Sequence, residues 1–324
     1  MENNALPKAQ TLGEWAYLAV EKHFHKTIKY ESDVIGDRDP EDLHQMRVGI
    51  RRLRSAMDGF APALDLPKAT QDKKVAKIGQ ILGELRDLDV LREALEEKYR
   101  PNLPKSEQKS LDKVLNRLAK QRQQTLLQVQ SLLNSPLYQE FKQAWEKWLH
   151  QPKYQVMAEF PIGDLLPSLL LPLISKWLLH PAWLIGIEVK AGEIDFLTEL
   201  GRDGVEDILT AQGEILHSLR KQTKRSRYQL ELFVESYDAH YAEIVQDFKA
   251  IQTILGDIQD SEVLGAFVTN IFQSATKSKL PTLMNQLAET RYQSWQEWQV
   301  FHQKYLQSAT KQNLLQTIIQ PQNN

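Results

Sequence analysis

Two histidine-led groups of basic residues stand out in this chain of 324 residues. In the first group His44 is followed by Arg47, Arg51 and Arg54 at helical spacing. On a helical wheel of about 100° per residue, these four side chains form one narrow stripe beside the apolar face. Stacked cations that border a core resist desolvation unless anions compensate them. Because the arginine fork suits phosphate, this first stripe predicts a site for a ligand with closely spaced negative charges.

A second stripe repeats the first. It consists of His217, Arg220, Lys224 and Arg227, with Lys221 beside it. Arg52 and Arg225 belong to the same basic segments but fall apart from the stripes on the wheel. The predicted binding residues are His44, Arg47, Arg51, Arg52, Arg54, His217, Arg220, Lys221, Lys224, Arg225 and Arg227.

Carboxylates downstream of each stripe offer internal compensation for the same cations. The predicted structural ion-pair partners are Asp87, Asp89, Asp260 and Glu262. Asp89 and Glu262 fall on the apolar side of their helices, which predicts that each orients an arginine of a basic helix rather than acting as a general base. How many cations remain available to a ligand stays open at this point.

Each histidine lies in line with three cations, so we expect it to donate a hydrogen bond to a phosphate oxygen, in part as imidazolium. The alternative is a neutral histidine near a helix end. Metal ligation is not expected, because no second histidine lies one turn away and the adjacent cations disfavour a divalent ion. The interior glycines Gly83 and Gly256 occupy equivalent positions and predict close approach of two helices.

The composition favours an all-α protein, because helix-forming Leu, Gln, Lys, Glu and Ala dominate. The chain contains no cysteine, which excludes disulfides and thiolate metal sites, and its net charge is −2. Residues 165–187 are apolar enough for a membrane span, but Pro167, Pro172 and Pro181 are expected to break the run into a buried helical hairpin. No integral membrane segment and no signal peptide are predicted, and a cytoplasmic location is expected.

An internal duplication organises the chain. A shift of 173 residues, from Leu43 to Leu216, aligns both the basic segments and the later segments 78–91 and 251–264. Two blocks that share one offset indicate a tandem repeat. We predict a first helical bundle at 11–150, a connector at 151–164, a second bundle at 165–308 and a frayed polar tail at 309–324.

The motifs at 44–48 and 51–54 resemble the signature of the CHAD family, the conserved histidine α-helical domain. The segment at 82–91 is similar to the second motif of that family, and 217–220, 224–228 and 255–260 are similar to the motifs of its second half. The resemblance implies two four-helix bundles with pseudo-twofold symmetry and a basic groove between them. It also implies binding of inorganic polyphosphate and association with polyphosphate granules. The Glu-x-Glu-x-Lys motif of the triphosphatase domain often fused to this family is absent.

The function expected from the sequence is therefore non-catalytic binding of polyphosphate, without a cofactor. Nucleic-acid binding is the first alternative, and it is disfavoured because Tyr228 is the one aromatic residue in the basic segments. A phosphohydrolase that uses His44 or His217 with Asp87 or Asp260 is a second alternative. A helical scaffold whose cations are all paired internally is a third. The oligomeric state is left open.

Overall fold

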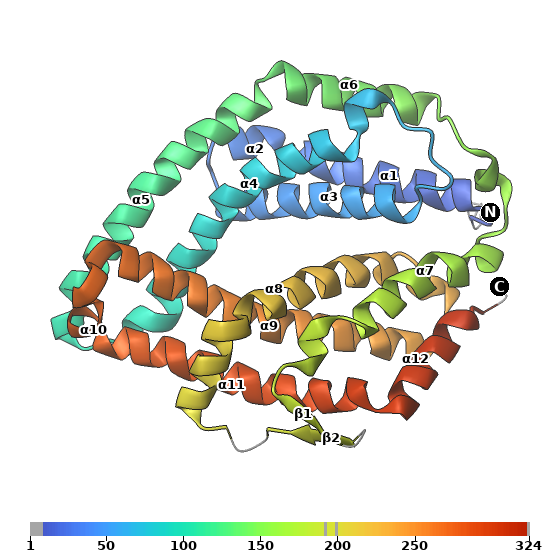
Figure 1. Ribbon diagram of the computed structural model, residues 1–324. Helices are drawn as coiled ribbons and strands as arrows, with labels where there is room; N and C mark the ends of the chain where they lie inside the picture. The colour runs from blue at the N-terminus through green and yellow to red at the C-terminus, as the bar shows by residue number, and fades with distance from the viewer. Residues whose placement is uncertain (1–8, 191–192, 198–199, 323–324) are drawn as a thin grey trace, which may run out of the picture. The chain divides into compact units, whose positions relative to one another are not determined.

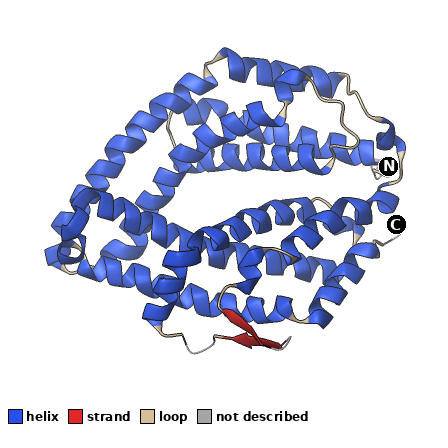
Figure 2. Cartoon of the chain, in the orientation of Figure 1, coloured by secondary structure: helices blue, strands red, loops and turns tan. Residues whose placement is uncertain are grey.

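A computed structural model describes residues 9–190, 193–197 and 200–322. The described chain is almost entirely helical, with one short antiparallel hairpin (Figure 2). The all-α class predicted from the composition is thus confirmed. The helices and strands are α1 Leu12–Lys29, α2 Glu31–Ile35, α3 Pro40–Gly59, α4 Asp72–Glu93, α5 Lys105–Leu133, α6 Pro136–His150, α7 Ile162–Leu178, β1 Ile187–Lys190, β2 Glu193–Phe196, α8 Arg202–Glu231, α9 Ala239–Phe272, α10 Thr276–Lys279, α11 Pro281–Leu306 and α12 Ser308–Ile319 (Figure 1).

Local sequence signals explain where the main helices begin. Thr11 and Glu14 form a capping box at the start of α1, in which each side chain accepts a hydrogen bond from the other residue's backbone N–H. Asp39 accepts a hydrogen bond from the Glu41 amide at 2.8 Å, and Pro40 occupies the first helical position of α3. These caps determine where the first basic helix begins and therefore which residues share its stripe.

Contacts divide the chain into two compact units. Unit 1 contains residues 9–89 and 121–169, and its core lies between α1, α3 and α6. Phe24 of α1 packs against Phe141 and Trp145 of α6, with ring centroids 6.1 and 6.4 Å apart. Gly49 of α3 lies against Thr27 of α1 so closely that an added Cβ would come within 2.6 Å of Oγ1. The α1–α3 pair is thus tightly packed.

Unit 2 contains residues 90–120 and 170–322. Its core is a cluster of aromatic side chains from α7, α9, α11 and the turn η5 Pro181–Leu184. Trp177 stacks on Phe248 at 4.3 Å, and Trp183 stacks on Trp298 at 4.9 Å. The Trp177 indole donates to the Thr223 hydroxyl at 2.8 Å and thereby ties α7 to the second basic helix, α8. Trp177 and Trp183 are buried in this core.

The predicted bundles, 11–150 and 165–308, differ from these units at residues 90–120, which pack within unit 2. The buried Glu107 of α5 explains this placement. Its carboxylate accepts hydrogen bonds from the backbone amides of Thr282 and Leu283 at the start of α11, at 3.1 and 3.4 Å. A carboxylate at a helix N-terminus satisfies amides that have no partner within the helix.

Two local expectations were wrong. The segment at 165–187 is not a hairpin broken by prolines, because α7 continues through Pro167 and Pro172 before it ends at Leu178. The tail is not frayed over its whole length either. Residues 308–319 form α12, because Leu314 and Ile318 lie one turn apart and are buried.

One stretch, Ile162–Leu184, is long and apolar enough to cross a membrane by length and composition. Its buried side chains include Leu170, Ile174 and Trp177, which pack inside the protein, whereas Leu179 is 83% exposed. The described chain therefore shows no clear integral membrane segment.

Candidate functional site

Both basic stripes lie on regular helices, as their spacing predicted. In α3 the apolar residues Met46, Ile50 and Leu53 are buried, and the stripe residues are only half-buried. The same holds in α8, where Leu216 and Leu219 are buried and His217 and Arg220 are partly exposed. The stripes thus border the core and still reach the surface.

Arg47 of the first stripe lies across α4. Its Nη1 donates to the Gly83 carbonyl at 3.2 Å and to the Asp87 carboxylate at 2.7 Å. A Cβ added to Gly83 would come within 3.3 Å of Arg47 Nη2 and 3.4 Å of Cζ. The missing side chain of Gly83 therefore makes the room in which the planar guanidinium rests.

Arg220 of the second stripe occupies the same position on α9. A Cβ added to Gly256 would come within 3.3 Å of Arg220 Nε and 3.4 Å of Nη2. The Asp260 carboxylate lies 3.8 Å from Nη2. Nε is buried and forms no hydrogen bond with any described residue. Each repeat thus contains an arginine seat, formed by a stripe arginine, a helical glycine and an aspartate one turn further on.

These seats explain the two interior glycines differently from the expectation. Gly83 and Gly256 were predicted to permit close approach of two helices, but their nearest neighbours outside their own helix are guanidinium groups. A helical glycine costs up to about 1 kcal/mol relative to alanine. The chain has such a glycine at both positions where the guanidinium of an arginine packs directly against the partner helix.

The other stripe arginines are held to different degrees. Arg54 Nε donates to Asp72 at 2.8 Å, and both side chains are partly exposed. Arg227 is more enclosed, because it contacts Gln252 at 3.0 Å and Glu231 at 2.9 Å. Exposed pairs contribute roughly 0–1 kcal/mol each, so the carboxylates of Asp87, Asp72 and Asp260 orient their arginines without binding them strongly.

The stripe histidines respond to burial and to the neighbouring charges. Burial and then the charge of Arg86 lower the pKa of His44 below its usual 6.5. Glu41 opposes this shift, and Arg51 and Arg47 add smaller lowering effects. The pKa of His217 is also lowered, by burial and then by Lys221, Arg220 and Lys224. Both rings are therefore mainly neutral at pH 7 in the unliganded protein.

Arg52 lies on the other flank of α3, beside α1. Its charge contributes to lowering the pKa of His23 to about 4 and also lowers the pKa of Lys26, in each case after burial. Arg86 of α4 is a site residue that the sequence interpretation missed, although it acts on His44 more strongly than either Arg51 or Arg47. It belongs to the predicted 82–91 motif, but its nearness to His44 depends on how α3 and α4 pack.

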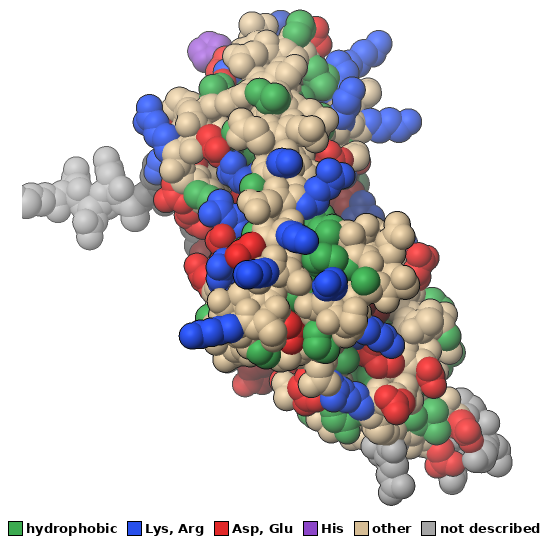
Figure 3. Space-filling model, turned by 90° about the vertical axis from the view of Figure 1, so that its left-hand side faces the viewer, with side chains coloured by type: hydrophobic (Ala, Val, Ile, Leu, Met, Phe, Trp, Pro, Cys, Tyr) green, Lys and Arg blue, Asp and Glu red, His purple; other side chains and the backbone are tan. Residues whose placement is uncertain are grey.

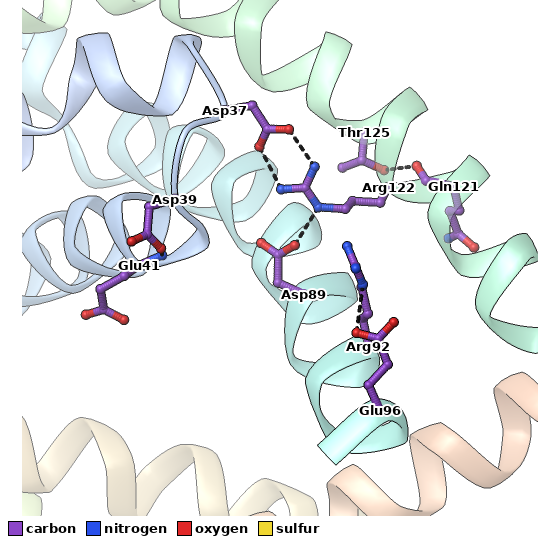
Figure 4. Close-up of polar contacts among 9 residues, drawn as sticks. All are labelled: Asp37, Asp39, Glu41, Asp89, Arg92, Glu96, Gln121, Arg122 and Thr125. Atoms are coloured by element: carbon purple, nitrogen blue, oxygen red, sulfur yellow. Dashed lines mark hydrogen bonds and ion pairs between the residues drawn. The ribbon is translucent and has the colours of Figure 1, made fainter. Parts of the chain in front are cut away.

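Asp89 does not pair with a basic-helix arginine, so that expectation was wrong. Its carboxylate accepts a hydrogen bond from Arg122 Nε of α5 at 2.6 Å. The same guanidinium donates two further bonds to Asp37, at 2.8 and 2.7 Å (Figure 4). Asp37 adopts a left-handed backbone conformation with φ 49°, which aspartate tolerates better than most residues. Arg122 thus connects the loop before α3 to both α4 and α5.

A related arrangement surrounds Glu262 in unit 2. Arg291 of α11 donates two bonds of 2.7 Å to Glu206 at the start of α8. Burial raises the pKa of Glu262, and the nearby charge of Arg291 partly offsets that shift. These three side chains line a pocket of about 640 Å³ together with His217 and Lys221. The arginine that acts on Glu262 is therefore Arg291 of α11, and not an arginine of α8.

The predicted binding residues of each repeat lie together on one helix, α3 in the first repeat and α8 in the second. Among the described residues, no cluster of three or more His, Cys, Asp or Glu side chains could hold a metal ion. The arrangement can bind anions through arginine forks, lysines and histidine N–H groups.

The fold and the site define a class of all-helical proteins in which a basic helix is duplicated and packs against a glycine-containing partner helix. The family model described as "CHAD domain" matches residues 18–269. The chain therefore belongs to the CHAD family, as its motifs predicted.

Solved structures share this fold. One is the crystal structure of the CHAD domain from the plant Ricinus communis, with 22% identity, a TM-score of 0.59, and coverage of 99% of this chain and 97% of that chain. Another is PptA from Streptomyces chartreusis, with 14% identity, a TM-score of 0.64, and coverage of 91% of this chain and 100% of that chain. A search of functionally curated proteins finds no match.

Proposed function

We propose that this protein binds inorganic polyphosphate through the two basic stripes, without catalysing a reaction. The observation that carries the proposal is the duplicated arginine seat. In both repeats a guanidinium rests on a helical glycine beside a half-exposed or exposed aspartate. A seated arginine has lost much of its conformational freedom before the ligand arrives, so less entropy is lost on binding.

The histidines support the same proposal. Burial and then the neighbouring cations lower the pKa of each histidine, and a bound polyanion would offset the effect of those cations. A bound phosphate raises the pKa of a neighbouring histidine and stabilises the imidazolium as a further donor. Membership of the CHAD family adds weight, because the resemblance implies a polyphosphate ligand.

The proposal is tested by titrating the protein at fixed ionic strength with polyphosphates of several lengths, ATP, pyrophosphate, and single- and double-stranded DNA. We expect polyphosphate to bind tightest and its affinity to fall steeply with salt, because bound cations release counterions. Tighter binding of either DNA would replace the proposal with nucleic-acid binding. Release of phosphate in the presence of Mg²⁺ or Mn²⁺ would instead favour a phosphohydrolase.

A cellular role follows from the same ligand. We expect a fluorescent fusion of the full chain to collect on polyphosphate granules in the cytoplasm. A variant with Arg47 and Arg220 replaced by alanine should remain diffuse. If that variant localises to granules as well as the wild type does, granule localisation does not depend on the two stripes.

A further inference from the structure

The N-terminal half of α5 carries a second type of basic surface, which no stripe includes. Lys105, Lys109, Lys113, Arg117 and Lys120 follow one another at intervals of three or four residues, and all five are exposed. They occupy an arc of about 120° on a helical wheel and span about 22 Å along the helix axis. The opposite face of α5 is buried.

The two acidic residues of this segment, Glu107 and Asp112, interact with groups outside the row. The Glu107 carboxylate is buried against the start of α11. Asp112 pairs with Arg100 at 2.9 Å. None of the five basic side chains forms an ion pair with a described residue of the chain. The surface is therefore a row of exposed cations outside any ion pair of the described residues, on a protein whose net charge is −2.

Two further cations adjoin this row. Lys277 and Lys279 of α10 are exposed, and α10 directly precedes the amides of α11 that bind Glu107. No acidic residue occurs between Glu262 and Glu289. Figure 3 shows the face along α5, where lysine and arginine side chains gather along the middle and carboxylates lie mainly to the sides. We call the five residues of α5 with Lys277 and Lys279 the α5 surface.

We propose that the α5 surface is a second polyphosphate-binding surface, so that one protein molecule holds two chain segments and crosslinks polyphosphate. This inference rests on the proposed function of the stripes. The α5 surface consists of residues 105–120 and two lysines of α10, whereas the stripes lie on α3 and α8. In the second repeat, the helix at the corresponding position is α11, which carries no comparable row of basic residues. The α5 surface is therefore not part of the duplicated motif.

The side chains of the α5 surface favour a thin phosphate chain over other polyanions. Between Lys105 and Lys120 no aromatic residue offers a platform for base stacking, and no large exposed apolar side chain offers an anchor for a membrane. Lysine is a hydrated point charge without a planar fork, which suits loose binding along a chain. Five such contacts predict a slope of about four in log K against log salt.

The test compares three variants of the full chain. The first replaces Lys105, Lys109, Lys113, Arg117 and Lys120 with glutamine. The control variant replaces five exposed lysines elsewhere with glutamine: Lys68, Lys147, Lys153, Lys176 and Lys249. The third replaces the stripe residues Arg47 and Arg220 with alanine.

Light scattering with long-chain polyphosphate measures crosslinking, and sedimentation with a short labelled polyphosphate counts binding sites. We expect the α5 variant to keep the tight sites, to lose the weaker, salt-sensitive class and to crosslink at least tenfold less than the wild type. The control variant should crosslink like the wild type. Equal crosslinking by the α5 variant and the wild type, or equal loss in the control, would overturn the inference.

The stripe variant separates this inference from the proposed function. If it binds short polyphosphate as tightly as the wild type, the stripes are not the ligand site and the proposed function fails. If it loses the tight class and keeps the weak one, both proposals stand. A wild type with one class of site and no crosslinking contradicts the α5 surface alone.

Discussion

The two repeats hold equivalent arginines with different firmness. In the first, Arg47 makes hydrogen bonds of 2.7 and 3.2 Å to Asp87 and the Gly83 carbonyl. In the second, Arg220 lies 3.8 Å from Asp260, and its buried Nε has no hydrogen-bond partner among the described residues. The glycine beneath the guanidinium is common to both. The shared part of the two repeats is therefore the surface on which the arginine lies, and the ion pair is the variable part.

The surroundings of the two histidines also differ. Arg86 adds a positive charge beside His44, whereas the second repeat has Gln259 at the aligned position, in the pocket that His217 lines. The cations nearest His44 thus come from both α3 and α4, whereas those nearest His217 all lie on α8. One glutamate opposes the lowering of the histidine pKa in each repeat, Glu41 in the first and Glu214 in the second, but Glu206 and Glu262 also line the pocket beside His217. We therefore expect the first repeat to bind an anion more strongly.

The largest expected effect concerns the arginines that hold each repeat together. Arg122→Ala leaves the buried Asp89 without its partner and should destabilise the protein by about 3–5 kcal/mol. Arg291→Ala should cost less, about 1–3 kcal/mol, because Glu206 is partly exposed and can be hydrated. Urea denaturation measures both values. Arg92→Ala, which removes an exposed pair with Glu96, is the control and should cost under about 0.5 kcal/mol.

A smaller effect tests the seats themselves. Alanine at Gly83 or Gly256 should push the guanidinium outward by a few tenths of an ångström and weaken polyphosphate binding about fivefold, or about 1 kcal/mol. Gly83→Ala should have the greater effect, because the Arg47 contacts are the shorter ones. Isothermal titration calorimetry measures the affinities.

Gly163→Ala is the control for the seats, because it lies in α7, outside the basic helices and their partner helices, and its added Cβ would have no heavy atom within 4 Å. It should stabilise the helix by roughly 0.5–1 kcal/mol and leave binding unchanged. A loss of affinity in this control equal to that of Gly256→Ala would assign the effect to helix rigidity rather than to the seat.

The smallest effect concerns protonation. The free-state pKa of each stripe histidine lies below 6.5, and bound phosphate raises it, so binding takes up protons. Affinity should therefore rise as the pH falls through the bound-state pKa and level off below the free-state pKa. Arg86→Gln should raise the free-state pKa of His44 and leave that of His217 unchanged. NMR titration of the two imidazoles checks both shifts, and an unmoved His44 would remove Arg86 from the site.

Helical periodicity made much of this structure predictable. The stripes and the two basic helices follow from spacing, because residues three or four apart share a helix face, and the repeat follows from the shared offset of 173 residues. The partner of Asp89 was not predictable in this way. Arg122 lies on α5, and from the sequence the arginines of α3 were equally plausible partners for Asp89. Which cation meets which carboxylate depends on helix packing, which the spacing within one helix does not contain.

Apolar segments were interpreted less well for a related reason. Pro167 and Pro172 each remove one helical hydrogen bond, yet α7 stays continuous because Leu170 and Ile174 pack into a core. In the tail, α12 docks because Leu314 and Ile318, one each of the pairs Leu314-Leu315 and Ile318-Ile319, are buried. The arginine seats were not predictable either. A glycine within a helix indicates that another group packs closely against it, but the sequence does not show which group that is.

The central claim is that the two stripes bind polyphosphate tightly. It is tested most directly by replacing Arg47, Arg51, Arg54, Arg220, Lys224 and Arg227 with alanine and titrating the variant with short polyphosphate. Circular dichroism serves as the control for helicity. We predict that the tight class of sites disappears while the helical signal is unchanged. Tight binding at wild-type affinity by this folded variant would contradict the account.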